Sequence, residues 1–413
     1  MSMKTILHCD ANNFYCSVEM QLNPKLRGIP IAVTGNPEKR HGIILAKSEE
    51  AKKLKVATGD TLWQARQKCP DILFVKPHYD AYVDFSERLF DLYSEYTDRV
   101  EPFGIDECWL DCTGSLLLFK SGENIANTLR ERAKKEIGVT ISVGVAPTKI
   151  FAKLGSDYKK PDATTVITPN NYKDIVWPLP VSDLLMVGRQ TTKLFKKLNI
   201  LTIGDLANFD VKVLKSYIGI NANKLHSYAN GIEIDDINHY EDRHIPESIG
   251  HSTTTPFDIT SLEEAIAVIV SLSEMVAIRL RRFNLMANGV GLSIKYNTLD
   301  GTHKNNLIAL PTDNASTIAD NTIKLLHELH NFDINNPIRQ LGVYTYNLLN
   351  SNIRQCSFFD NEEIKNNKVE NSVDKIRLKY GYQSVQKGIV FKHNDLCDGL
   401  EEKRFKPFKK DKY

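Results

Sequence analysis

The spacing of apolar residues divides the first 170 residues into short strands and amphipathic helices. Residues 4–10 (KTILHCD) form an apolar run typical of a short buried strand, and residues 139–145 (VTISVGV) alternate as in a half-buried strand. Apolar residues at 82, 85, 89, 92 and 96 step by three and four, which predicts an amphipathic helix. Residues 100–114 (VEPFGIDECWLDCTG) predict a hairpin between these elements.

The second half of the chain shows a different order of elements. Glycines at 188, 204, 219 and 231 break residues 181–236 into short helices, and a polar linker follows. Residues 248–349 give strand, helix, strand, strand, helix and strand, which is the split β-α-β pattern with helices on one face of a sheet. Past residue 350 the composition turns polar and rich in Asn and Lys, which we interpret as a tail.

Length and composition restrict the class of protein. A chain of 413 residues predicts two to four domains, and 42% hydrophobic with 25% charged residues is ordinary for a globular protein. The most apolar stretch, AIAVIVSLSEMVAI, contains Glu274 and several serines, so we expect no membrane span. Seven cysteines without dense spacing and no signal peptide indicate a soluble, cytoplasmic protein in a reducing compartment.

The net charge of +2 conceals basic segments. Lysines at 149, 153, 159 and 160 face only Asp157, and Arg279, Arg281 and Arg282 cluster at the end of an expected helix. Such patches suit a polyanion, although a solvated helix face explains any one of them equally simply.

Three carboxylates carry the candidate chemistry. Asp10 ends an apolar strand, and Asp106 and Glu107 are adjacent acids in apolar surroundings, where ionisation requires a compensating cation. Mg²⁺ binds through a few carboxylates and substrate phosphates, and two such ions ~3.5–4 Å apart can promote phosphoryl displacement. The alternative, that these are exposed turn acids and a strand-end cap, stays open from these residues alone.

The cysteines and histidines give weaker evidence for a functional site. Cys108 and Cys112 lack the further ligands of a zinc site, so we reject zinc. Four scattered histidines are interpreted as packing or surface residues: His8, His41, His78 and His251.

Five segments in order resemble one known family. HCDANNFYCSVE, GIDECWLD, GVAPTKIFAKLGSDYKKP, LMVGRQTTKLFKKLNILTIGDL and SIGHSTTT resemble the motifs of the Y-family translesion DNA polymerases, especially the DNA polymerase IV branch. The resemblance covers nearly all of residues 4–360.

The resemblance implies a multidomain α/β (α+β) fold. It implies a palm with a mixed or antiparallel sheet and helices, small fingers, a helical thumb with a helix-hairpin-helix, and a βαββαβ little finger. The implied ranges are palm 1–13 and 78–168, fingers 14–77, thumb 169–236, linker 237–247, little finger 248–349, and a tail at 350–413 with a clamp-binding peptide.

The resemblance also implies residue roles in catalysis. Asp10, Asp106 and Glu107 match the catalytic metal-binding acids, with the carbonyl of Ala11 as a further ligand. The residues matched to nucleotide binding are Asn13, Phe14, Tyr15, Lys52 and Lys160. Among them Tyr15 matches the steric gate against a ribose 2′-OH, and Lys160 matches a lysine that contacts the triphosphate. Core packing is the alternative for Phe14 and Tyr15.

The chain departs from the family pattern at several positions. Glu49 replaces a tyrosine that hydrogen-bonds the triphosphate, and Lys52 replaces an arginine, so it keeps the charge but loses the bidentate fork. Met186 replaces the first glycine of the thumb hairpin, where Gly188 remains and Gly219 can serve a second hairpin.

The resemblance implies two macromolecular partners. Primer-template DNA would contact Gly188, Gly219, Arg279, Arg281, Arg282 and Lys295. Lys304 would join these contacts to the DNA backbone, which carry no sequence preference. A sliding clamp would bind the peptide Gln355, Cys356, Ser357, Phe358 and Phe359, with Cys356 in place of a leucine. The alternative for Phe358 and Phe359 is that they fold back onto the last domain.

We therefore expect a template-directed, low-fidelity translesion DNA polymerase that adds dNMP to a primer 3′-OH without proofreading. Its cofactors would be two Mg²⁺ ions, with Mn²⁺ possible, and it would act as a monomer with no membrane partner. The alternative is a catalytically impaired DNA- and clamp-binding protein on a polymerase scaffold. A different two-metal transferase with a palm-like sheet would leave the thumb and the last domain without a role.

Overall fold

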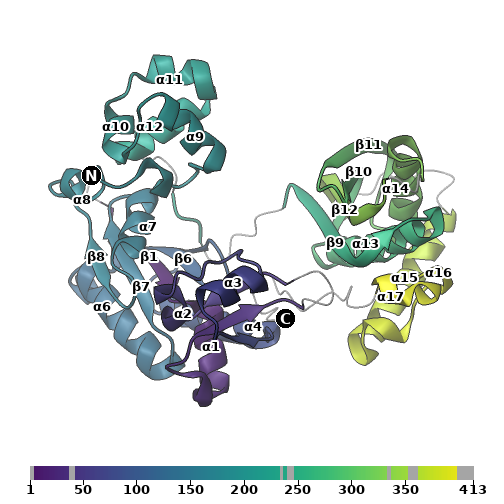
Figure 1. Cartoon of the computed structure of the whole chain (residues 1–413), viewed down its shortest axis with the longest axis horizontal. Helices are drawn as coiled ribbons and strands as arrows, with labels where there is room; N and C mark the ends of the chain where they lie inside the picture. The colour runs from purple at the N-terminus through teal and green to yellow at the C-terminus, as the bar shows by residue number, and fades with distance from the viewer. Residues whose placement is uncertain are drawn as a thin grey trace. The chain divides into compact units, whose positions relative to one another are not determined.

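The computed structural model describes residues 4–36, 42–232, 236–239, 246–332, 336–351 and 361–397, the last range without the side chains of 361–368. The chain divides into two compact units, one N-terminal to the polar segment near residue 240 and one C-terminal to it. Figure 1 shows the elements of both units. In the described residues no helix is long and apolar enough to cross a membrane.

A five-stranded sheet lies at the centre of the first unit. Its strand order is β5-β6-β1-β7-β8, with β1 antiparallel to both β6 and β7. The strands are β1 (Ile6–Ala11), β5 (Val100–Pro102), β6 (Glu107–Asp111), β7 (Ile141–Ala146) and β8 (Thr164–Val166). The buried strand at 4–10 and the hairpin at 100–114 are therefore confirmed.

The strand at 139–145 is buried on both faces, although its alternation predicted a half-buried one. Helices cover both sides of the sheet: Val143 and Val145 pack in the core with α4 (Tyr79–Ser94) and α6 (Gly122–Arg132), while Ala146 packs with α7 (Lys149–Tyr158). At Gly144 the backbone of α7 comes so close that a Cβ would lie 1.9 Å from the Ala152 carbonyl oxygen.

A small sheet and two short helical regions complete the first unit. The small sheet has the order β3-β2-β4 (Ile44–Lys47, Ile31–Thr34, Leu73–Val75) and packs with α2 (Glu49–Lys53) and α3 (Leu62–Lys68). Helix α1 (Phe14–Leu22) joins the two sheets. Shorter elements are η1 (Pro24–Leu26), η3 (Thr113–Ser115), α5 (Leu116–Phe119), η4 (Ala133–Ile137), α8 (Tyr172–Ile175) and η5 (Val181–Asp183).

Four helices follow before the polar segment: α9 (Arg189–Lys197), α10 (Ile203–Asn208), α11 (Val211–Ile218) and α12 (Asn221–Ala229). Gly188, Gly219 and Gly231 lie between or after helices, as expected. The break expected at Gly204 is wrong, because Gly204 is the second residue of α10 and packs against Trp177.

The second unit has the predicted order of elements. These are β9 (Ser248–Ile259), α13 (Leu262–Arg282), β10 (Leu285–Tyr296), β11 (Gly301–Thr312), α14 (Ala315–Leu329) and β12 (Ile338–Asn350). Neighbouring strands are antiparallel in the order β11-β10-β12-β9. Apolar residues from the sheet and both long helices form one core.

Residues 361–397 form helices where we expected only a tail. These are α15 (Asn361–Tyr380), α16 (Gly388–Lys392) and α17 (Asn394–Cys397), with η6 (Tyr382–Ser384) between α15 and α16. Val390, Leu396 and Cys397 join the core of the second unit, and Figure 1 shows this segment in yellow beside α13. Helix α13 is apolar on nearly all sides, so it needs cover on more faces than the sheet supplies.

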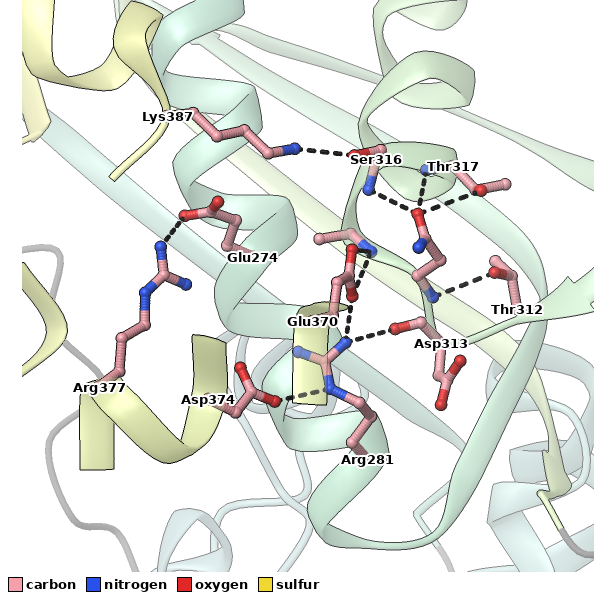
Figure 2. Close-up of polar contacts among 12 residues, drawn as sticks. Glu274, Arg281, Thr312, Asp313, Ser316, Thr317, Glu370, Asp374, Arg377 and Lys387 are labelled. Carbon is pink, nitrogen blue, oxygen red and sulfur yellow. Dashed lines mark hydrogen bonds and ion pairs between the residues drawn. The ribbon is translucent and has the colours of Figure 1, made fainter. Parts of the chain in front are cut away.

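Polar contacts also attach α15 to the second unit (Figure 2). Arg377 donates to the Glu274 carboxylate of α13 at 2.9 Å, and the Tyr382 hydroxyl donates to the same oxygen at 2.9 Å. Further along α13, Arg281 pairs with two acids of α15, with Glu370 at 2.5 Å and with Asp374 at 2.7 Å. The polar composition of this segment reflects ion pairs with α13 rather than a solvated tail.

Candidate active site

The three candidate acids meet where β1 and β6 pair. Asp10 lies opposite Glu107 in the antiparallel register, and the Ala11 N–H donates to the Asp106 carbonyl at 3.0 Å. Directly paired residues of antiparallel strands share a face, with Cβ atoms ~4.5–5.5 Å apart. The pairing therefore brings together two carboxylates that lie far apart in the chain, those of Asp10 and Glu107.

Two lysines of the α7 region reach the same carboxylates. Lys153 Nζ lies 2.8 Å from Glu107 Oε2 and 3.2 Å from Asp10 Oδ2. Lys160 Nζ lies 2.7 Å from Asp10 Oδ2. Asp157 contacts both ammonium groups, at 3.3 Å from Lys153 and 2.8 Å from Lys160. The close approach of α7 to Gly144 brings this helix over β1, the strand that contains Asp10.

The acids differ in their ionisation. Burial, together with the neighbouring charges of Asp10 and Glu107, raises the pKa of Asp106 to about 7. Burial opposes ionisation of Glu107 as well, but His8 and Lys153 outweigh it and lower the pKa of Glu107 to about 2. Burial likewise works against the charge of Lys153, yet the surrounding carboxylates raise its pKa.

His8 contacts this cluster, although the sequence led us to interpret it as a packing or surface residue. It is fully buried, with Nδ1 2.8 Å from the Ser156 hydroxyl and Nε2 3.5 Å from Glu107 Oε2. Burial lowers the pKa of His8, which favours a neutral ring. The alternation of side chains along β1 could have indicated this contact, because residues 8 and 10 lie on the same face of the strand.

The donor set suits a hard cation. Within the described residues, no three His, Cys, Asp or Glu side chains already form a metal-ligand group. Lys153 and Lys160 compensate Asp10 and Glu107, whereas the pKa of Asp106 stays raised because its carboxyl is buried and lies beside two other acids. Oxygen donors with uncompensated negative charge fit Mg²⁺.

Four of the five residues expected around the nucleotide lie on or directly before α1 and on α2, and the fifth, Lys160, follows α7. Asn13 occupies the N-cap position of α1 with a left-handed backbone (φ 48°), but its side chain does not cap the helix. Its amide instead donates to Glu49 Oε1 at 2.8 Å, and Lys52 Nζ lies 3.5 Å from the same oxygen. The acid that replaces the family tyrosine is therefore held by an amide and a lysine.

The two aromatic candidates differ in position. Tyr15 is half-buried and stacks on Tyr82, with ring centroids 4.2 Å apart and an interplanar angle of 11°. Tyr82 in turn donates to the buried carboxylate of Glu19 at 2.5 Å, which fixes the ring beneath Tyr15. Phe14 is 3% exposed in the core, which favours the packing interpretation for Phe14.

The hairpin candidates have the backbone that such a turn needs. Gly188 is the N-cap of α9, and Gly219 adopts φ +61° between α11 and α12. Met186 also adopts a positive φ of 72°, so the chain keeps the left-handed conformation where the family has glycine. Such a conformation costs a non-glycine residue ~1–2 kcal/mol.

The candidate cations of the second unit fall into two groups. Lys295 and Arg282 are exposed, whereas Arg279 donates to the Gly250 carbonyl at 3.1 Å. Arg281 is occupied by Glu370 and Asp374, so the structure assigns it to the attachment of α15. The clamp peptide 355–359 lies outside the described residues.

Lys304 pairs with Glu328 at 2.6 Å, and both side chains are nearly half exposed. An exposed ion pair of this kind is worth little, so the lysine remains available to other anions.

Comparisons with known proteins identify the family of this chain. Residues 9–157 match the impB/mucB/samB family, and residues 246–358 match the impB/mucB/samB family C-terminal domain. The chain is 45% identical over 398 residues to DNA polymerase IV of Acetivibrio thermocellus, which covers 95% of this chain and 99% of that protein. It is 35% identical over 398 residues to DNA polymerase IV 1 of Bacillus subtilis, covering 95% and 94%.

A solved structure of a Y-family DNA polymerase chimera has the same fold. It superposes with a TM-score of 0.74 at 23% identity and covers 84% of this chain and 99% of that one. Relatives this similar over nearly the whole length do not favour the alternative of a non-catalytic binder. The chain therefore belongs to the Y family of DNA polymerases, in its DNA polymerase IV branch.

Proposed function

We propose that this chain extends a DNA primer against a template, with Asp10, Asp106 and Glu107 as its catalytic acids. The primer 3′-OH attacks the α-phosphate of a dNTP, and pyrophosphate leaves. The observation that carries the proposal is the register of β1 and β6, which sets Asp10 opposite Glu107 beside Asp106. Asp10 and Glu107 lie on paired strands, which hold side chains more rigidly than loops do, and Asp106 directly precedes β6.

Two bound Mg²⁺ ions would supply the positive charge that the attacking and leaving oxygens need. Asp10 and Asp106 would hold both ions, Glu107 would hold mainly the ion beside the 3′-OH, and the Ala11 carbonyl would be a further ligand. Mn²⁺ accepts the same oxygen donors.

The incoming triphosphate would lie beside Lys160. This lysine now contacts Asp10 and Asp157, and an ammonium at that place can donate to phosphate once Asp10 has another cation. Asn13 and Lys52 would border the same pocket, where both contact the carboxylate of Glu49. The Tyr15 ring, supported by Tyr82, would occupy the space of a ribose 2′-OH.

DNA would be held through its backbone. The hairpins at Gly188 and Gly219 would offer backbone N–H groups to phosphate, and Arg279, Arg282, Lys295 and Lys304 would add charge. Such contacts weaken with salt and carry no sequence preference. Arg281 is left out of this set because two acids of α15 already hold it.

We also propose that the chain is divided into a palm (1–13 and 78–168), fingers (14–77), a thumb (169–236) and a little finger (248–349). The peptide 355–359 would bind the sliding clamp, and the chain would act as a monomer in the cytoplasm, where the replicating DNA is.

Primer extension by an Asp106→Asn variant tests the catalytic assignment. We expect a loss of about a thousandfold or more, since the change removes one charged ligand worth several kcal/mol in the transition state. Asp111→Asn, at the other end of β6, is the matched control and should extend primers normally. If Asp106→Asn binds primer-template and still incorporates dNTPs at the wild-type rate, the assignment is wrong.

A further inference from the structure

The ammonium group of Lys153 contacts three carboxylates of the acid cluster. Its ammonium lies 2.8 Å from Glu107, 3.2 Å from Asp10 and 3.3 Å from Asp157, while its side chain is only 15% exposed. It therefore bridges the two strands that supply the acids. The function proposed above uses Lys160 for phosphate but gives Lys153 no role.

The fold determines this position. Thr148 caps α7 by accepting from the Phe151 N–H, and Gly144 admits the α7 backbone against β7. Together they direct the second turn of α7 over the end of β1. An ammonium there offsets the repulsion between carboxylates that are buried side by side.

Asp157 is an alternative ion-pair partner for Lys153. It lies one turn further along α7, at the i,i+4 spacing at which side chains of a helix meet. The Asp157 side chain is 47% exposed, so it lies at the outer edge of the cluster. Lys153 can keep this partner while giving up Asp10 and Glu107.

We propose that Lys153 is a resident counter-cation of the acid cluster, which holds Asp10 and Glu107 together without metal and moves to Asp157 when a divalent cation binds. This inference rests on the proposed role of the acids as metal ligands. It makes Lys153 a positioning residue and a competitor of the metal. Replacing Lys153 should therefore raise the affinity for the metal and lower the stability of the metal-free protein.

Equilibrium Mn²⁺ binding to the full chain, followed by calorimetry, tests the proposal. We expect Lys153→Met to bind Mn²⁺ about tenfold more tightly than the wild type, because a competing charge has gone. Asp157→Asn should bind Mn²⁺ severalfold more weakly, because Lys153 loses its second partner. Lys159→Met, a nearby exposed lysine that contacts Tyr158, is the matched control.

Thermal unfolding without metal gives a second readout. Lys153→Met should melt at a lower temperature than the wild type, and saturating Mn²⁺ should remove the difference. The proposal is overturned if Lys153→Met is folded and binds Mn²⁺ no more tightly than the wild type. If Asp106→Asn binds Mn²⁺ as the wild type does, the metal site itself is wrong, which is a separate failure.

Discussion

Arg377 and Glu274 form an ion pair of 2.9 Å with only 7% and 8% of their side chains exposed (Figure 2). The pair connects α15 to α13, a helix that is buried along most of its length. Arg377 also donates to the Val385 carbonyl at 2.7 Å, and the Tyr382 hydroxyl donates to Glu274, so the buried charges are well hydrogen-bonded. The residues after 360 thus belong structurally to the second unit.

Breaking this pair should destabilise the second unit. Arg377→Met leaves Glu274 buried and uncompensated, which should lower the free energy of unfolding by about 3–5 kcal/mol. Calorimetric unfolding of the full chain measures the change. Lys379→Met, an exposed position on the same helix, should change it by less than about 0.5 kcal/mol, and equal effects of the two variants would contradict the buried contact.

Glu49 should weaken nucleotide binding. Its carboxylate is partly exposed beside the pocket proposed for the triphosphate, so Glu49→Gln should lower KM for dNTP by roughly two- to fivefold and change kcat less. Steady-state incorporation of single nucleotides measures both constants. Glu50→Gln, the next acid on α2, is the control, and an unchanged KM in Glu49→Gln would remove Glu49 from the pocket.

Tyr15 should exclude ribonucleotides by its ring. Tyr15→Ala should reduce the preference for dNTP over rNTP by at least about tenfold, since space for a 2′-OH opens above Tyr82. Tyr15→Phe keeps the ring and should keep the preference. Competing incorporation of dNTP and rNTP on one template decides the matter, and equal discrimination by wild type and Tyr15→Ala would end the gate assignment.

The peptide 355–359 should couple synthesis to the clamp. Replacing Phe358 and Phe359 by alanine should abolish the increase in product length that a loaded clamp produces, because two aromatic anchors are lost. Synthesis without the clamp should continue. Phe391→Ala removes a phenylalanine that is 74% exposed on α16 and should keep the response. A full response in the double variant would show that the clamp binds elsewhere.

Much of the fold follows from local patterns. The order of strands and helices in the second unit and the strand ending in Asp10 could be predicted, because the spacing of apolar residues reflects which side of an element is buried. The full burial of β7 could not, since alternation does not reveal a helix that packs over Gly144. The helices after residue 360 were also missed, because their polar side chains are satisfied by partners on α13.

The sequence by itself determined the family and the order of elements in residues 248–349, and it identified the three candidate acids, since these depend on residue types in a fixed order along the chain. Only the tertiary structure decided what surrounds the acids: Lys153 and His8 reach Glu107 from α7 and β1, and Glu49 meets Asn13 across two elements. It also decided that Arg281 serves α15. Ion pairs and hydrogen bonds between distant segments depend on distances in space, which no local periodicity contains.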